Sequence, residues 1–133
     1  MTNMKIISTK LHGVLDYTVG LILATSPWLF GFYRGGPETW IPVVLGSSTV
    51  LYSLFTNYEA GIIKKIPMPF HLTLDLLAAL FLAISPWIAG FAGHVWWPHL
   101  IIAVLETSVV LLTYPEEKAR KRAYRVTPES EAR

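Results

Sequence analysis

The sequence predicts an all-α integral membrane protein. We expect four transmembrane helices, formed by two parallel two-helix repeats that are related by a pseudo-two-fold axis along the membrane normal. Two observations predict this fold. Of the 133 residues, 53% are hydrophobic and only 15% are charged, a balance that is unusual for a small soluble domain. In addition, the tripeptide Ser-Pro-Trp occurs twice, and the residues around it repeat as well.

The repeat is an internal duplication with an offset of 59 residues. At this offset His12 aligns with His71 and Asp16 aligns with Asp75. From residue 12 to residue 32, 11 of 21 positions are identical to those of the window 71–91. Shared hydrophobicity does not explain a match that includes His, Asp, Pro and Trp. The repeated tripeptide consists of Ser26, Pro27, Trp28, Ser85, Pro86 and Trp87.

Nearly uncharged runs predict four spanning helices, at about 11–32, 40–56, 70–92 and 97–114. Each run is near the roughly 20 residues that a helix needs to cross a hydrocarbon core of ~30 Å. The runs lack the alternation of a membrane β-barrel. We therefore expect a single membrane domain over residues 1–133, with repeat 1 at about 11–58, repeat 2 at about 70–115 and a basic cytoplasmic tail at 116–133.

The first hydrophobic run is not expected to be a cleavable signal, because it carries Asp16 and is itself one copy of the duplication. The absence of cysteine excludes disulfides, thiolate metal sites and cysteine catalysis. In the predicted topology Arg34 lies on one side of the membrane and the other ten lysines and arginines lie on the opposite side. This asymmetry places both termini in the cytoplasm, with the protein in the bacterial inner membrane.

The basic tail is expected to attract anionic lipids at the membrane surface, and no nucleic-acid partner is predicted. The duplicated His-x-x-x-Asp, the Ser-Pro-Trp and the following Gly-Phe resemble the SPW-repeat family of small bacterial membrane proteins. The resemblance covers roughly residues 12–115. It implies an integral membrane protein built from two two-helix repeats, and it implies no activity, cofactor or catalytic residue.

A polar stripe follows one face of the first and third predicted helices. His12 and Asp16 are four residues apart and continue into small residues at the same spacing, namely Gly20 and Ala24. The third helix carries the matching residues His71, Asp75, Ala79 and Ala83. Small residues at this spacing let membrane helices approach closely, so we expect the two stripes to face each other near the pseudo-two-fold axis.

Two interpretations of the stripe remain open. In the first, His12, Asp16, His71 and Asp75 bind a divalent metal, or the two histidines ligate haem. In the second, each histidine bonds to a carboxylate and fixes the arrangement of the helices. We favour the second interpretation, so no cofactor is predicted.

The Ser-Pro-Trp motif is expected to be structural. The proline removes a backbone hydrogen bond and kinks the helix, and the serine is positioned to bond a freed carbonyl. The tryptophan suits the interfacial belt. Gly31 and Gly90 then end the helices.

Glu106 lies about midway along the fourth predicted helix and has no acidic counterpart in the second. Its equivalent there is Gly46, Thr49 or Val50, depending on the alignment. An ionisable group at mid-membrane marks a functional hypothesis, and its anion is costly there. We expect the neutral acid, hydrogen-bonded to Thr49, Ser53 or a backbone carbonyl. His94 and His99 are expected to be exposed.

An enzyme is not favoured, because the chain lacks a nucleophile–base pair, a nucleotide-binding loop and a zinc-protease motif. The favoured function is that of a structural or assembly module that associates with itself or with a larger membrane complex. The alternatives are proton- or ion-coupled transport through the bundle, and metal or haem binding by the His/Asp pairs.

Overall fold

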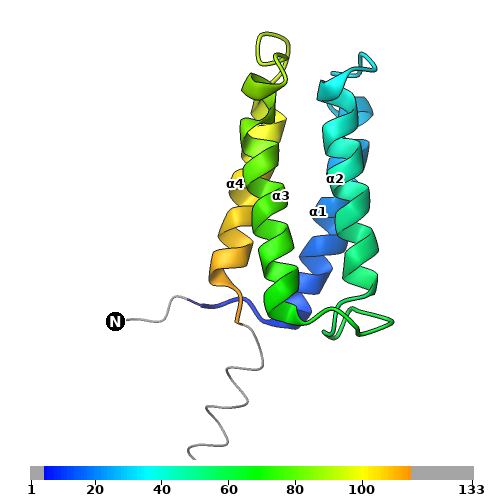
Figure 1. The fold of residues 1–133 in the computed structure, drawn as a ribbon, viewed down its shortest axis with the longest axis vertical. Coiled ribbons are helices and arrows are strands. Elements are labelled where there is room, and N and C mark those ends of the chain that lie inside the picture. The colour runs from blue at the N-terminus through cyan, green and yellow to red at the C-terminus, as the bar shows by residue number, and fades with distance from the viewer. Residues whose placement is uncertain (1–4, 115–133) are drawn as a thin grey trace, which may run out of the picture.

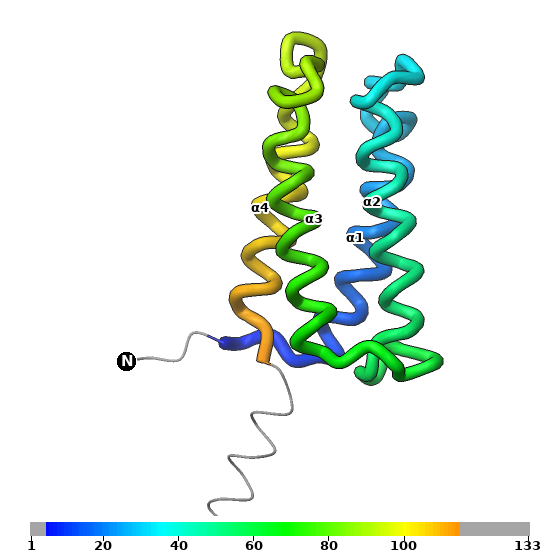
Figure 2. Tube along the Cα trace, viewed as in Figure 1, coloured from blue at the N-terminus to red at the C-terminus, as the bar shows by residue number. Residues whose placement is uncertain are grey.

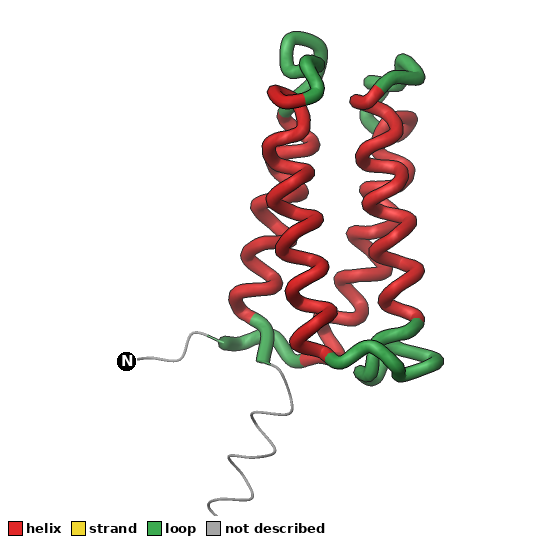
Figure 3. The backbone as a smooth tube through the Cα atoms, in the orientation of Figure 1, coloured by secondary structure: helices red, strands yellow, loops and turns green. Residues whose placement is uncertain are grey.

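The computed structural model describes residues 5–114, which form four helices. They are α1 (Thr9–Leu29), α2 (Pro37–Leu54), α3 (Met68–Ile88) and α4 (Trp97–Leu112) (Figure 1). Between residues 5 and 114 the chain contains helices and loops but no strand (Figure 3). The predicted all-α fold with four helices is confirmed. The basic tail at 116–133 lies outside the described residues.

The helices begin up to three residues earlier than predicted and end two to four residues earlier. Helix α1 begins early because Ser8 caps it: the Ser8 hydroxyl accepts a hydrogen bond from the Leu11 amide at 3.2 Å. Helix α3 begins after Pro67, with Pro69 in its first turn, where a proline costs no helical hydrogen bond.

The helices pack as two pairs, α1 with α2 and α3 with α4 (Figure 2). Helix α2 also contacts α3, and α1 contacts α4. The first pair is very close at Gly46, where an added Cβ atom would lie 2.5 Å from the Gly20 carbonyl oxygen and the Ala24 amide nitrogen. The predicted seam of Gly20 and Ala24 against Ala79 and Ala83 is therefore wrong. The small residues of α1 pack against α2, because Gly46 of the same hairpin offers them a matching surface.

Each Ser-Pro-Trp motif lies in the last turn of its helix. Pro27 has no N–H to donate to the carbonyl of Leu23, four residues earlier. The Ser26 hydroxyl donates to that carbonyl instead, at 2.8 Å. In the second repeat Ser85 donates in the same way to the carbonyl of Leu82, also at 2.8 Å. The predicted role of the serine is confirmed.

Glycine then ends both helices. Gly31 and Gly90 have φ angles of +69° and +76°, a left-handed conformation that a residue with a side chain adopts only with strain. Beyond each glycine, the amide of the next phenylalanine bonds back to the carbonyl of the motif's proline, at 2.9 Å for Phe32 and 2.8 Å for Phe91. This closure directs both phenylalanines inward, where they belong to one buried cluster. Trp28 and Trp87, in contrast, are more than half exposed.

His99 is buried, so the prediction that it is exposed was wrong, whereas His94 is exposed as predicted. The His99 ring lies 5.4 Å from the Phe32 ring and 5.0 Å from the Phe91 ring, measured between centroids. The two Gly-Phe turns converge on the start of α4, and the imidazole fills the space between their phenyl rings.

By length and composition, α3 is long and apolar enough to cross a membrane, and α4 is apolar but shorter. Among the described helices, only α3 meets both requirements. That all four helices cross the bilayer remains a prediction. Large apolar side chains are nevertheless exposed along every helix, including Leu21, Leu51, Leu77 and Val104.

Candidate functional site

Four predicted site residues converge where α1 and α3 begin. His12 Nε2 lies 3.1 Å from Asp16 Oδ1 and 3.0 Å from Asp75 Oδ2. His71 Nε2 lies 3.0 Å from Oδ2 of each aspartate. All four side chains are buried. We call His12, Asp16, His71 and Asp75 the quartet. Each carboxylate contacts one histidine of its own repeat and one of the other repeat, so the quartet joins the two helix pairs.

A threonine orients each histidine of the quartet. His12 Nδ1 lies 2.8 Å from the Thr113 hydroxyl, and His71 Nδ1 lies 2.7 Å from the Thr56 hydroxyl. Both hydroxyls donate their own proton to a backbone carbonyl one helical turn earlier. They therefore accept from the imidazoles, which places a proton on each Nδ1. Each contact between an Nε2 atom and an aspartate oxygen then requires a proton, on the nitrogen or on the oxygen, or a cation between them.

The backbone brings each threonine to its histidine in the same way. Thr113, after α4, pairs with Ile7, just before α1, and Thr56, after α2, pairs with Ile66, just before α3. The end of one helix pair thus holds the start of the other. The two threonines are 57 residues apart, and this register makes Thr49 the counterpart of Glu106.

Two tyrosines complete the hydrogen bonding of the carboxylates. The Tyr58 hydroxyl donates to Asp16 Oδ2 at 2.8 Å, and the Tyr52 hydroxyl donates to Asp75 Oδ1. Burial and the nearby Asp16 carboxylate raise the pKa of Tyr58, which lies in the loop after α2, so its phenol stays a donor. Neither the tyrosines nor the threonines were predicted as site residues from the sequence. The repeated threonine was a usable signal, but neither tyrosine recurs at the equivalent position in the second repeat.

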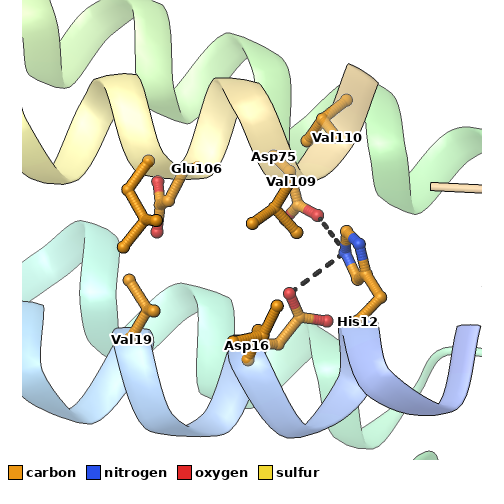
Figure 4. Close-up of a pocket in the computed structure, with 9 residues that line it drawn as sticks. His12, Asp16, Val19, Asp75, Glu106, Val109 and Val110 are labelled. Atoms are coloured by element: carbon orange, nitrogen blue, oxygen red, sulfur yellow. Dashed lines mark hydrogen bonds and ion pairs between the residues drawn. The ribbon is translucent and has the colours of Figure 1, made fainter. Parts of the chain in front are cut away.

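Glu106, the fifth predicted site residue, faces a small cavity beside the quartet (Figure 4). The space open to the centre of a water-sized sphere is about 20 Å³, which is room for about one water molecule. Within residues 5–114, Glu106 makes no hydrogen bond to Thr49 or Ser53, so the predicted bond to these side chains is not formed. Thr49 donates instead to the carbonyl of Leu45 at 3.0 Å. The cavity is lined by His12, Leu15, Asp16, Val19, Asp75, Leu105, Glu106, Val109 and Val110.

Residues 10–113 match the family model of the SPW repeat domain. The chain belongs to the SPW repeat family. This match confirms the resemblance that the duplicated motifs indicated. Searches of curated proteins and of solved structures found no match.

The two SPW repeats differ where the cavity lies. In the first repeat, α2 directs Tyr52 at Asp75, with Thr49 one turn away and 3.3 Å from the phenol oxygen. In the second repeat, α4 carries Val109 at the position of Tyr52 and Glu106 at the position of Thr49. A valine in place of a phenol removes a ring from this side of the quartet. The cavity occupies the corresponding space, lined by Val109 and Glu106.

The geometry limits what the SPW quartet can bind. The two imidazole rings lie 5.4 Å apart between centroids, and both Nε2 atoms contact the same oxygen of Asp75. This leaves no space for a porphyrin between the histidines, so the haem alternative does not fit. The side chains of the quartet instead present two ring nitrogens and two carboxylates, with ligand atoms that all lie within 4.8 Å of one another.

Proposed function

We propose that the protein is a structural module of the bacterial cytoplasmic membrane, in which the buried quartet locks two helix pairs into one bundle. The observation that carries this proposal is that each carboxylate contacts a histidine from both repeats at 3.0–3.1 Å. The locked bundle then associates with itself or with a larger membrane complex. The bilayer is its first partner, with anionic lipids at the basic tail.

The exposed surface supports placing all four helices in the membrane. Leu21 of α1, Leu51 of α2, Leu77 of α3 and Val104 of α4 are each 58–60% exposed. Soluble monomers rarely expose apolar surface on every side, whereas lipid tails would cover it. Helix α3 is long and apolar enough to span, and the other three helices run beside it (Figure 2). The repeats would then be parallel, related by a pseudo-two-fold axis along the membrane normal.

Basic residues support the orientation. The starts of α1 and α3, where the quartet lies, are at one end of the bundle, and the loop between α1 and α2 is at the other (Figure 1). Lys5 and Lys10 lie at the start of α1, Lys64 and Lys65 precede α3, and Arg34 lies in the loop between α1 and α2. Lysine and arginine are retained on the cytoplasmic side of bacterial membrane proteins. The quartet would then lie near the cytoplasmic surface and the Ser-Pro-Trp motifs near the outer surface.

A polar lock suits this environment. Between membrane helices the lipid supplies no hydrophobic driving force, so packing and polar contacts hold the pairs together. The four groups of the quartet balance as two imidazolium and two carboxylate charges. Separating the helix pairs would leave each carboxylate with one histidine instead of two. Removing one partner from a buried ion pair costs about 3–5 kcal/mol.

A double-mutant cycle between the repeats tests the lock. His12→Gln and Asp75→Asn should each reduce the free energy of unfolding in mild detergent by about 3–5 kcal/mol, because each leaves buried charge unpaired. The double variant should lose less than the sum by about 1–3 kcal/mol, since its residues share one network. His94→Ala, in an exposed residue, is the matched control and should be additive with Asp75→Asn. Additive losses for the His12 and Asp75 pair would refute the lock.

The cavity favours one second candidate, proton- or ion-coupled transport. It brings Glu106 beside His12, Asp16 and Asp75, so a water molecule there can connect the acid to the quartet. Under this hypothesis Glu106→Gln would abolish proton flux in liposomes and preserve the stability of the bundle. If the unsubstituted protein carries no proton flux, the transport hypothesis is rejected, and the proposal of a structural lock is unaffected.

A further inference from the structure

We infer that the quartet is also a binding site for one divalent transition-metal ion, held by the two histidine Nε2 atoms and the two aspartate carboxylates. The inference deepens the proposed lock and rests on the same four residues. The geometry, an unbonded nitrogen, the threonine contacts and the charge balance each support it.

The ligand atoms are close to the spacing that a tetrahedral ion requires. Zinc binds histidine nitrogen and carboxylate oxygen at about 2.0–2.1 Å, which sets the edge of the tetrahedron at about 3.3 Å. In the quartet, each histidine Nε2 lies 3.0–3.1 Å from one oxygen of each aspartate. His12 contacts Oδ1 of Asp16 and His71 contacts Oδ2, so admitting the ion would require a rotation of the Asp16 carboxylate together with an outward shift of a few tenths of an ångström at these contacts. Two imidazoles and two carboxylates also form a mixed set that suits zinc better than calcium or magnesium, which prefer six or more oxygens.

His71 provides an independent observation. Its side chain is fully buried, and two carboxylate oxygens lie 3.0 Å from its Nε2 atom. Nevertheless Nε2 makes no hydrogen bond with acceptable geometry, because neither oxygen lies along the direction of its N–H. The nitrogen lies at the same distance from both carboxylates. A buried nitrogen without a hydrogen bond is costly, and an ion at the centre of the quartet would satisfy it.

The threonines already prepare both histidines for a metal. A histidine that ligates a metal through one nitrogen usually donates its other N–H to a neighbouring acceptor. Thr113 and Thr56 are such acceptors for His12 and His71, at 2.8 Å and 2.7 Å. Both rings therefore keep a proton on Nδ1 and direct Nε2 toward the carboxylates. The same arrangement appears in both repeats.

Replacing two protons of the quartet with one divalent ion leaves the net charge of the interior unchanged. In the proton form, two imidazolium and two carboxylate groups sum to zero. In the metal form, a divalent ion, two neutral imidazoles and two carboxylates also sum to zero. One ion enters, forms bonds to two nitrogens and two oxygens, and releases two protons. No net charge is added to a low-dielectric region, where an uncompensated charge is expensive.

Two phenols and one acid surround the quartet. Tyr52 of α2 and Tyr58 of the following loop donate to the carboxylates, and Glu106 of α4 faces the quartet across the cavity. The cavity lies on the side of α1 and α4 and has room for about one water molecule. We therefore expect a cation to enter, and the released protons to leave, on this side of the quartet.

Calorimetry on the full chain tests the inference. Chelator-treated protein in mild detergent is titrated with Zn²⁺ at pH 7 in two buffers that differ in ionisation enthalpy. We expect one ion per chain and the release of about two protons, because both histidines lose their Nε2 proton. Binding should therefore weaken about 100-fold for each unit that the pH falls while both histidines begin protonated. Co²⁺ should give the visible absorption bands of a tetrahedral site.

Variants locate the site. Asp75→Asn and Asp16→Asn each remove one ligand, and each should weaken Zn²⁺ binding by more than the roughly 10–100-fold effect of losing an outer partner. His94→Ala, in an exposed histidine, should leave the titration unchanged. If the aspartate variants do not fold, the Zn²⁺ titration and the Co²⁺ spectrum of the unsubstituted chain still decide the question.

The outcomes separate the metal site from the lock. Absence of Zn²⁺ binding would overturn the metal site, whereas the lock would still be judged by the coupling between His12 and Asp75. Binding that is lost in His94→Ala and kept in Asp75→Asn would assign the ion to the surface and would also overturn the inference. One ion bound with two protons released, together with loss in both aspartate variants, supports it.

Discussion

Replacing Ser85 with alanine isolates the contribution of the serine in Ser-Pro-Trp. The Ser85 hydroxyl donates to the carbonyl of Leu82 at 2.8 Å, and Pro86 has no N–H to offer that carbonyl. Both Ser85 and Leu82 are fully buried, so water does not replace the lost donor. Leaving a buried acceptor unsatisfied costs about 1–3 kcal/mol. Alanine also favours the helix slightly over serine, by less than about 1 kcal/mol, so we expect a net loss of about 1–2 kcal/mol.

The assay is reversible unfolding in mild detergent, followed by circular dichroism as a denaturing detergent is added. Ser108→Ala is the matched control. Its hydroxyl donates to the carbonyl of Val104 at 2.7 Å, but the side chain is exposed, and that carbonyl, four residues earlier, is also in register to accept the backbone N–H of Ser108 itself. The control should change the free energy of unfolding by less than about 0.5 kcal/mol. Ser26→Ala, at the equivalent position of the first repeat, should match Ser85→Ala.

A loss for Ser85→Ala no greater than that for Ser108→Ala would refute the reasoning. It would mean that the carbonyl freed by Pro86 finds another donor, and that the serine is not required to satisfy it. A large loss for Ser85→Ala with none for Ser26→Ala would show instead that the two motifs are not energetically equivalent.

Two further predictions concern packing and topology. Gly46→Ala should destabilise the bundle by about 1–3 kcal/mol through overpacking, because the new Cβ atom would meet backbone atoms of α1 at 2.5 Å; Gly93→Ala, with no atom within 4 Å, is the control, and equal stability of the two variants would contradict the close approach. Reporter fusions after Arg133 should give a cytoplasmic signal and fusions within residues 34–38 an external one, because the basic residues favour that orientation. The reverse pattern would contradict the proposed topology.

The duplication made much of the architecture predictable. Two copies of His-x-x-x-Asp at helical spacing indicated that His12, Asp16, His71 and Asp75 would meet, and they do. The position of the serine relative to the proline likewise predicted the bond to the freed carbonyl. The bond of the serine depends on spacing within one helix, where the geometry is fixed by 3.6 residues per turn. The meeting of the four polar residues followed from the cost of exposing an acid to lipid, which turns both His/Asp pairs toward the interior.

Other features depended on contacts between helices, and spacing does not determine those. Gly20 and Ala24 were predicted to face the other repeat, but small residues pack against any helix that offers a close surface, and Gly46 of α2 offers it. The Tyr52 and Tyr58 contacts were not predictable from a repeat, because neither tyrosine has an equivalent in the second copy. His99 was misplaced because its burial depends on where Phe32 and Phe91 converge.

The positions at which the two repeats differ indicate where an activity other than a structural one would lie. The repeats agree at the quartet, at the threonines and at the Ser-Pro-Trp turns, which are the contacts that close the bundle. They differ where Tyr52 and Thr49 are replaced by Val109 and Glu106, beside a cavity that reaches His12 and both aspartates. A purely structural lock gains nothing from replacing a ring that donates to a carboxylate with a smaller residue and an acid. The α1 and α4 side of the quartet is therefore where ion or proton exchange should be sought first, and variants of Val109 and Glu106 are those expected to alter exchange without breaking the lock.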